Sequence, residues 1–326
     1  MKFSLIICTY MRAEQLLKLL ISVQDQVLYP DEILIVDGSP DDKTKLILEQ
    51  NSFKKLQYFL VSEKERGLTK QRNYGISKVS PTSDFVCFLD DDIVLESSYF
   101  KNLLHTYNLF PEALGTGGYI VNEIEWEKVP ENYKAKSDEF YYDGWKRKDA
   151  SRFVIRKKLN LDTDCAPGYS PYFSHGRSVS FLPPSNKIYP VEMLMGGVSS
   201  FRKSVFDNFS FSDYFFGYGL YEDADFTLRV SKAGPLFINT SARLNHFHAP
   251  SGRPNQYTYG KMVVRNGWYV WRVKNPKPGL KDRLRWHCIT LLLIVIRFSN
   301  IFTTSKRREA FTETLGRVVG WVQILV

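Results

Sequence analysis

The sequence is poor in cysteine and has no long uninterrupted run of apolar residues. Its four cysteines are spread over 326 residues without a CxxC pair, which argues against a disulfide framework or a zinc knuckle and favours a reducing, cytoplasmic setting. The apolar run near the N-terminus, Phe3 to Cys8, is too short for the hydrophobic region of a signal peptide, so we expect no secretion signal. Because 44% of the residues are hydrophobic, the chain can still bury the core of one or two domains.

Acidic residues are scarce in the C-terminal part of the chain. Residues 251–326 contain 14 Lys or Arg and 3 acids, a net charge of +11, which leaves −2 for the rest of a chain whose total is +9. The apolar block Ile289 to Ile296 lies between His287 and Arg297 and is well short of the ~20 residues that a spanning helix needs. Interleaved apolar residues favour an anionic membrane surface over nucleic acid as the partner of basic amphipathic helices. The alternative is a helical pair packed on the rest of the protein.

Strand-like and helix-like segments alternate through the first 110 residues. The expected strands are Phe3 to Cys8, Glu32 to Val36, Leu56 to Val61 and Asp84 to Leu89. The expected helices are a segment with Leu16, Leu17, Leu20 and Val23 at helical spacing, then Lys43 to Gln50, Leu68 to Lys78 and Tyr99 to Leu109. Such alternation predicts right-handed crossovers and a parallel sheet, in which ligands bind beyond the carboxyl ends of the strands.

Three adjacent carboxylates, Asp90, Asp91 and Asp92, follow the last of these strands. Oxygen ligands of this kind suit a hard divalent cation, which usually brings substrate phosphates with it. In extended backbone Asp90 and Asp92 point to one side, where they can grip one cation, while Asp91 faces elsewhere and suits a ribose hydroxyl. The alternative is that Asp92 caps the following helix, although Ser97 and Ser98 are better placed for that.

Other strand ends and helix starts carry polar groups. Asp37, before Gly38, can accept a hydrogen bond from a nucleobase or simply form a turn. The basic segment from Arg66 to Asn73 begins a helix, where it either attracts anions or is a solvated helix face. Asp223 lies in the first turn of an expected amphipathic helix. A short strand is expected at Pro235 to Asn239. If the backbone beyond it is extended, His246 and His248 fall on one side, either as metal ligands suited to manganese or as core or surface histidines.

Taken together and in order, these motifs resemble the donor-binding half of family 2 glycosyltransferases. The resemblance rests on Cys8-Thr9-Tyr10-Met11-Arg12, Val36-Asp37-Gly38-Ser39, Gly67 with Lys70-Gln71-Arg72-Asn73-Tyr74-Gly75, and Phe88-Leu89-Asp90-Asp91-Asp92. It continues in the Gly-rich stretch Met195 to Arg202, in the Glu-Asp motif Tyr221 to Asp225 and in His246. It covers about Lys2 to Trp271.

The resemblance implies a fold and a division of the chain. The fold is GT-A, an α/β fold whose mixed, mostly parallel sheet is flanked by helices, here with a C-terminal helical extension. Residues 1–250 would form the catalytic domain, with a nucleotide-sugar-binding half at 1–122 and an acceptor half at 123–250. Residues 251–326 would form the basic extension. The stretch from Glu123 to Pro190 has no clear periodicity, so its aromatic residues are expected either in the acceptor pocket or in ordinary packing.

The resemblance also implies an activity and residues for it. The activity is inverting, metal-dependent transfer of one sugar from a nucleotide-sugar to an acceptor hydroxyl of a glycan or lipid-linked acceptor, in cell-surface glycan or polysaccharide assembly. Asp223 would be the general base. The residues implied for the donor nucleotide are Thr9, Arg12, Asp37, Arg72 and Asp91. Those implied for Mn2+ or Mg2+ are Asp90, Asp92 and His246. The setting would be cytoplasmic, peripheral on the inner face of the membrane.

The sequence departs from the family pattern in places and leaves alternatives open. Gly38 stands where many relatives have a second Asp, so part of the nucleotide contact can come from Ser39 or from backbone. The Gln-x-x-Arg-Trp signature of processive synthases is absent, which favours one transfer per binding event. His248 can replace His246 as ligand. Two other functions remain: a haloacid-dehalogenase-like phosphatase with Asp90 as nucleophile, and an inactive scaffold that keeps the fold.

Overall fold

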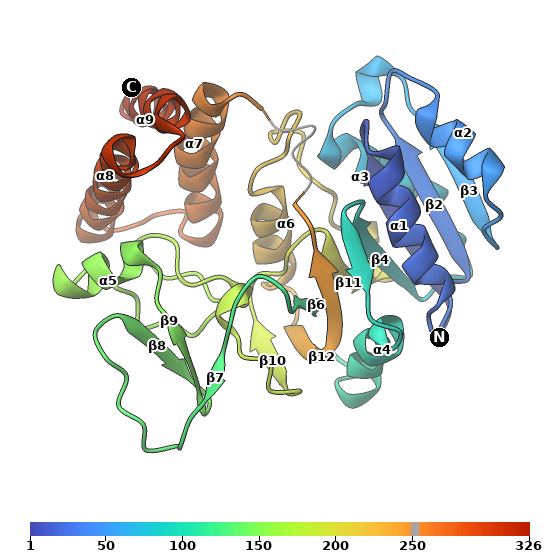
Figure 1. Cartoon of the computed structure of the whole chain (residues 1–326), viewed down its shortest axis with the longest axis horizontal. Helices are drawn as coiled ribbons and strands as arrows, with labels where there is room; N and C mark the ends of the chain where they lie inside the picture. Colours follow the sequence, from blue (N-terminus) through green and yellow to red (C-terminus); the bar gives the residue numbers. More distant parts are fainter. Residues whose placement is uncertain (249–253) are drawn as a thin grey trace. The chain divides into compact units, whose positions relative to one another are not determined.

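The computed structural model describes residues 1–248 and 254–326 (Figure 1). The chain forms two compact units, one of Met1–Ile124 with Pro184–Gly252 and one of Glu125–Pro183 with Arg253–Val326. Every residue named above for the metal, the donor or the base belongs to the first unit. The expected division between residues 250 and 251 lies outside the described residues, and it stays a prediction.

The N-terminal half of the first unit is the expected alternation of strands and helices. Its parallel strands lie in the order β3 (Leu56–Leu60), β2 (Glu32–Asp37), β1 (Phe3–Thr9) and β4 (Phe85–Asp90). The helices between them are α1 (Ala13–Gln24), α2 (Lys43–Gln50) and α3 (Leu68–Lys78). Because the strands are parallel, their carboxyl ends share one edge of the sheet, and Thr9, Asp37 and Asp90 all lie there.

The other half of the sheet is mixed. The strand β11 (Val198–Arg202) is antiparallel to both β4 and β6 (Gly115–Ile120), and β12 (Leu236–His246) is parallel to β6. Two further strands, β10 (Ile188–Val191) and β5 (Ile93–Leu95), pair with β12 in antiparallel fashion. Since β5 directly follows the carboxylate triplet, its pairing with the end of β12 brings His246 opposite Ile93.

Both faces of this sheet are covered. Leu5 and Ile7 of β1 belong to a core with α1 and with α4 (Tyr99–Leu109). The intervening Ile6 faces the other side, where Gly75 of α3 lies against it. On that second face Phe88 packs near aromatic residues of the segment that leads to α6 (Glu222–Val230). The alternation of side chains along a strand explains why β1, β2 and β4 are apolar at nearly every position.

Two local expectations change in the structure. The strand expected at Pro235 to Asn239 is part of β12, which runs on for eleven residues to His246. Asp92 does not cap a helix, because β5 follows it and α4 begins only at Tyr99. Ser98 occupies the N-cap position of α4, but its side chain makes no capping hydrogen bond.

The second unit contains a small antiparallel sheet and helices. The sheet has the order β7 (Glu127–Lys128), β9 (Trp145–Lys148) and β8 (Glu139–Tyr142), and α5 (Ser151–Lys158) follows it. Asp143 and Gly144 join β8 to β9 with φ angles of 50° and 77°, as a two-residue hairpin turn requires. Short 3-10 turns are η1 (Glu63–Glu65), η2 (Val179–Phe181) and η3 (Lys203–Asp207), the first and last in the other unit.

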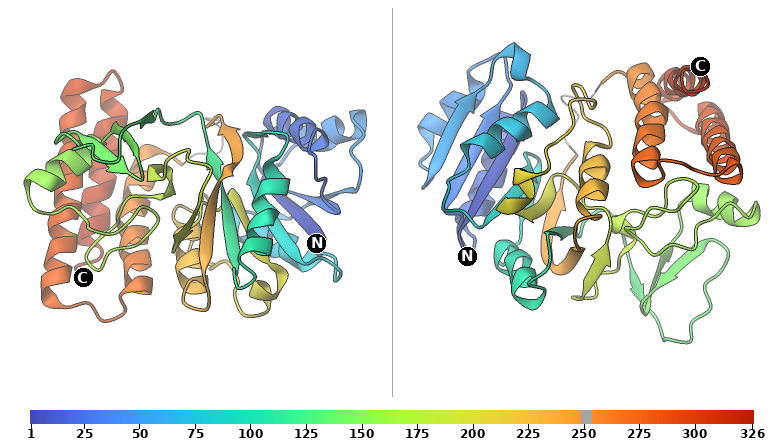
Figure 2. Two further views of the ribbon diagram at one scale, coloured as in Figure 1. Left: turned by 90° about the horizontal axis from the view of Figure 1, so that it is seen from below. Right: turned by 180° about the vertical axis from the view of Figure 1, so that it is seen from behind.

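Three long helices complete the second unit: α7 (Gln256–Lys274), α8 (Leu280–Thr303) and α9 (Arg307–Val322). They lie side by side in both views of Figure 2 and share a cluster of tryptophans. Among the described residues α8 alone is long and apolar enough to cross a membrane, with a mean hydropathy of 1.5 over an 18-residue window. A single such helix is weak support for a span. The apolar part of α8 nevertheless extends beyond the apolar block of residues 289–296 that is evident in the sequence.

Candidate active site

The carboxylate triplet ends β4 and forms the turn into β5, with its three side chains in different surroundings. Asp90 is part-exposed, with 41% of its side chain accessible, whereas Asp92 is buried. Oδ1 of Asp92 lies 3.1 Å from Nε2 of His246. One ligand atom from each of Asp90, Asp92 and His246 can be chosen so that all lie within 4.8 Å of one another. Two carboxylates and an imidazole so arranged suit Mn2+ or a similar divalent cation.

Asp91 points away from this cluster. Its Oδ2 accepts a hydrogen bond of 2.7 Å from Thr9 Oγ1, and its Oδ1 pairs with Arg12 Nη1 at 2.9 Å. Burial raises the pKa of Asp91 to about 6, although Arg12 and Thr9 lower it. The same Arg12 nitrogen lies 3.4 Å from Asp92 Oδ2. The Arg12 guanidinium therefore contacts both Asp91, the expected ribose partner, and Asp92, an expected metal ligand.

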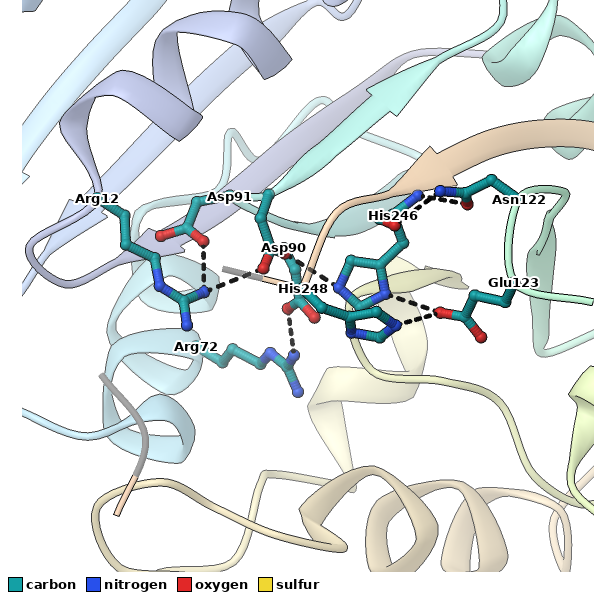
Figure 3. Close-up of polar contacts among 9 residues, drawn as sticks. Arg12, Arg72, Asp90, Asp91, Asn122, Glu123, His246 and His248 are labelled. Carbon is teal, nitrogen blue, oxygen red and sulfur yellow. Dashed lines mark hydrogen bonds and ion pairs between the residues drawn. The ribbon is translucent and has the colours of Figure 1, made fainter. Parts of the chain in front are cut away.

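A second acidic group stands behind the histidine. Figure 3 shows the rings of His246 and His248 side by side, both directed at Glu123. Glu123 Oε1 lies 3.3 Å from His246 Nδ1 and 2.7 Å from His248 Nε2. Burial lowers the pKa of His246, but the hydrogen bonds to Asp92 and Glu123 outweigh it and raise the pKa to about 10. No sequence motif points to Glu123, which reaches this position from the loop after β6.

Arg72 joins the acidic triplet to α6. It is buried, stacks 5.2 Å from the Phe211 ring centroid, and pairs through Nη1 with Oε1 of Glu222. Its Nη2 lies 3.5 Å from Oδ1 of Asp90. Burial raises the pKa of Glu222 to about 8 despite the attraction of Arg72, and the nearby Asp223 raises it further. Oε2 of Glu222 is buried without a hydrogen-bond partner in the described part of the chain.

Asp223 lies beside the Gly-rich stretch before β11. Its Oδ2 accepts a hydrogen bond of 3.2 Å from the backbone N–H of Gly196, and its Oδ1 one of 2.7 Å from Ala224. Burial raises its pKa, while these two N–H groups lower it. Gly197, which follows Gly196, packs against the Asp90 carboxylate, because a Cβ at this glycine would stand 2.0 Å from Asp90 Cγ. The two glycines thus separate the expected base from the expected metal ligand.

Asp37 stabilises the turn after β2 through hydrogen bonds. It is fully buried, accepts a hydrogen bond of 2.8 Å from Ser39 N–H on Oδ1, and accepts one of 3.0 Å from Tyr58 O–H on Oδ2. Ser39 Oγ in turn accepts from Met11 N–H at 2.7 Å. The turn after β2 is thereby bonded to the loop after β1. Asp37 and Ser39 are both buried, and a contact of either with a nucleotide stays a prediction.

The structure brings most of the residues expected from the sequence into one place. Direct contacts link the expected metal ligands and the expected ribose partner Asp91 to the two arginines. Asp223 adjoins this group through Gly196 and Gly197. Asp37 lies at the end of the neighbouring strand β2, buried and hydrogen-bonded to the Ser39 N–H. Sequence reasoning missed Glu123 and Tyr58, and it assigned no function to Glu222. Glu222 could have been found from the sequence, because it directly precedes Asp223 in the Glu-Asp motif.

Comparison with known proteins identifies the class. A sequence model described as Glycosyl transferase family 2 matches residues 4–174, just over half of the chain. A crystal structure of GalNAc-T7 with UDP, GalNAc and Mn2+ superposes with a TM-score of 0.52 over 81% of this chain and 48% of that chain. At 15% sequence identity this likeness shows the fold alone. It confirms the expected GT-A arrangement.

Two curated relatives match the N-terminal part in sequence. A glucosyl-dolichyl phosphate glucuronosyltransferase from Haloferax volcanii is 29% identical over 147 residues, 44% of each chain. A GalNAc(5)-diNAcBac-PP-undecaprenol beta-1,3-glucosyltransferase from Campylobacter jejuni is 32% identical over 109 residues, 33% of this chain and 35% of the relative. The matches therefore span less than half of the length of either relative.

Proposed function

Because this chain belongs to glycosyltransferase family 2, we propose that it is an inverting, metal-dependent enzyme that moves one sugar from a nucleotide-sugar to an acceptor hydroxyl. Membership makes the chain a glycosyltransferase. The proposal concerns its metal, its stereochemistry and its substrates. The observation that carries it is the cluster of Asp90, Asp92 and His246, whose ligand atoms lie within 4.8 Å of one another.

The metal site is proposed from the chemistry of these three side chains. Asp90 and Asp92 would hold Mn2+ or Mg2+ through oxygen and His246 through Nε2, while Glu123 holds the other ring nitrogen in place. When bound, the ion supplies positive charge against the diphosphate that leaves the donor. Arg72, buried and adjacent to Asp90, adds a fixed positive charge at the same edge of the sheet.

Asp223 is proposed as the general base. The acceptor oxygen attacks the anomeric carbon and forms the new C–O bond, while the bond from that carbon to the diphosphate oxygen breaks. The hydroxyl proton passes to a carboxylate oxygen of Asp223, and the nucleoside diphosphate leaves with the electron pair. A single displacement of this kind inverts the anomeric centre. The raised pKa of Asp223 supports the role, since a base works best when its pKa approaches the working pH.

The donor nucleotide is proposed to lie across the carboxyl ends of β1, β2 and β4. Asp91 would accept a ribose hydroxyl hydrogen bond, with Thr9 and Arg12 holding its carboxylate in position. Arg72 would face phosphate. Asp37 would act by shaping the turn that presents Ser39 to the base.

The acceptor and the location are proposed from the printed substrates of the relatives. One relative is named for a dolichyl phosphate substrate and the other for a PP-undecaprenol substrate. A glycan or lipid-linked acceptor in cell-surface glycan or polysaccharide assembly fits both. Such an acceptor suits a cytoplasmic enzyme that sits peripherally on the inner face of the membrane, with the basic residues 251–326 toward anionic lipid. Without the signature of processive synthases, one transfer per binding event is expected.

A thermal-shift screen tests this function. UDP, GDP and dTDP are each added with and without Mn2+, because a ligand that binds the folded state raises the melting temperature. We expect one nucleotide to stabilise the protein only when Mn2+ is present, and Asp92→Asn to lose that dependence. Indifference to all three nucleotides would overturn the proposal in favour of an inactive scaffold. Transfer without metal by the EDTA-treated enzyme would overturn the metal assignment alone.

A further inference from the structure

The outward face of α8 is apolar along its whole length. Six large side chains on it are between 40% and 73% exposed. They are Leu280, Leu284, Leu291, Val295, Phe298 and Phe302. At 100° per residue they fall within an arc of about 60°, and the buried residues Trp286 and Ile289 lie on the opposite side. We call these six residues the α8 stripe.

The helix α9 carries a second stripe of the same kind. Phe311, Leu315, Val318 and Val322 are between 39% and 48% exposed and also span an arc of about 60°. The opposite face of α9 is buried. We call these four residues the α9 stripe. Exposed apolar stripes along two helices mark an interaction site rather than isolated surface residues.

Contacts within the unit fix both stripes outward. Gly316 of α9 packs on the backbone of α7, since a Cβ there would stand 2.1 Å from the Tyr257 carbonyl oxygen. Glu313, also on the inner face of α9, pairs with Arg297 of α8 at 2.7 Å and with Arg317 at 2.6 Å. Rotating either helix to bury its stripe would break these contacts.

Charge decides what covers the stripes. Residues 251–326 carry a net +11, so a second copy of this segment would meet like charge. Exposed basic residues stand at the start of each helix, at Lys281 and Arg283 for α8 and at Arg307 and Arg308 for α9. Apolar stripes bordered by Lys and Arg match the acyl boundary and the head groups of an anionic bilayer.

We propose that the α8 and α9 stripes dock in the plane of an anionic lipid bilayer, with their side chains in the acyl boundary and the flanking basic residues on the head groups. The inference rests on the membrane location proposed above and is independent of the sugar-transfer step. If the proposed nucleotide and metal site is wrong, the nucleotide thermal shift is absent without any lipid, whereas a failure of docking appears only with lipid.

Vesicle sedimentation of the full chain tests the docking. We expect binding to vesicles of phosphatidylglycerol and phosphatidylcholine, weaker binding to pure phosphatidylcholine, and release by salt. The double variant Leu315→Ser with Val318→Ser should weaken binding at least about tenfold. Replacing Arg307 and Arg308 by Gln should weaken it about fivefold for each charge removed. The matched control is Leu46→Ser, which removes a side chain that is 51% exposed on α2 and should change nothing.

Three outcomes would overturn the inference. Equal vesicle binding by the stripe variant and the control, with melting temperatures unchanged, would remove the stripes from the interface. A lipid-free dimer in analytical ultracentrifugation that the stripe variant abolishes would assign the stripes to a second copy. Retention of the protein on vesicles after an alkaline carbonate wash would mean that α8 spans the bilayer instead of lying in its plane.

Discussion

Nε2 of His246 lies 3.1 Å from Oδ1 of Asp92, although 154 residues separate them in the chain. The contact exists because β5, which follows Asp92, pairs with the end of β12, which His246 terminates. The backbone adds a second link, a hydrogen bond of 3.0 Å from Phe247 N–H to the Asp92 carbonyl oxygen. Sheet pairing therefore holds the nitrogen and oxygen ligands of the proposed metal site at a fixed separation.

His246→Ala should weaken Mn2+ binding on the order of 100-fold, because it removes a proposed ligand. The control His248→Ala should weaken it by less than about tenfold, since the His248 Nε2 pairs with Glu123, behind the ligand. Isothermal titration with MnCl2 measures both. A larger loss for His248→Ala would move the metal to the alternative cluster of Glu123, His246 and His248.

Gly197→Ala should abolish the Mn2+-dependent thermal shift, because its Cβ would occupy the place of the Asp90 carboxylate. Either Asp90 or the backbone must then move, at a cost of about 1–3 kcal/mol in folding free energy. Gly279→Ala is the control, since the nearest atom to its Cβ is 4.0 Å away. An unchanged Mn2+ shift in Gly197→Ala would show that Asp90 is not needed for the ion.

Asp223→Asn should lower sugar transfer about 10²–10⁴-fold, as expected on removal of a general base. The amide keeps one of the two acceptor oxygens that the Gly196 and Ala224 N–H groups use, so stability should fall by no more than about 1–3 kcal/mol. The neighbouring Asp225→Asn is the contrast. Asp225 is buried and pairs with Arg229 at 2.7 Å, so its replacement should lower stability by about 1–3 kcal/mol and leave turnover per folded molecule intact. Turnover assays alongside thermal unfolding separate the two. Normal transfer by Asp223→Asn would require another base.

Glu222→Gln should flatten the pH dependence of stability in the metal-free protein. Burial raises the pKa of Glu222 from 4.5 to about 8, so the folded state favours the protonated side chain. That contribution is present in full below pH 4.5 and is lost as pH rises through about 8. The wild-type melting temperature should therefore fall more between pH 6 and 9 than that of Glu222→Gln. Each 1 kcal/mol lost from the free energy of unfolding should lower the melting temperature by roughly 2–4 °C. Parallel curves would mean that Glu222 is ionised throughout this range.

Local sequence patterns were sufficient for the N-terminal half. The helices α2, α3 and α4 have the bounds expected from periodicity, Lys43–Gln50, Leu68–Lys78 and Tyr99–Leu109. Between Glu123 and Pro190 the patterns failed, because short strands with mixed aromatic and charged residues have no clear period. The Asp143-Gly144 turn was a readable signal there, since that dipeptide is typical of two-residue hairpins.

The sequence by itself determined the family, the α/β alternation and the residue types of the site, because strand-end motifs and helical periods are local properties. Only the tertiary structure decided which of these side chains are buried and which partners each one contacts. It buried Asp37 with its carboxylate bonded to the Ser39 N–H, turned Asp91 toward Thr9 and Arg12, and added Glu123 behind His246. These outcomes depend on the pairing of β5 with β12 and on the packing around Arg72, which join residues far apart in the chain. No local pattern encodes such long-range contacts.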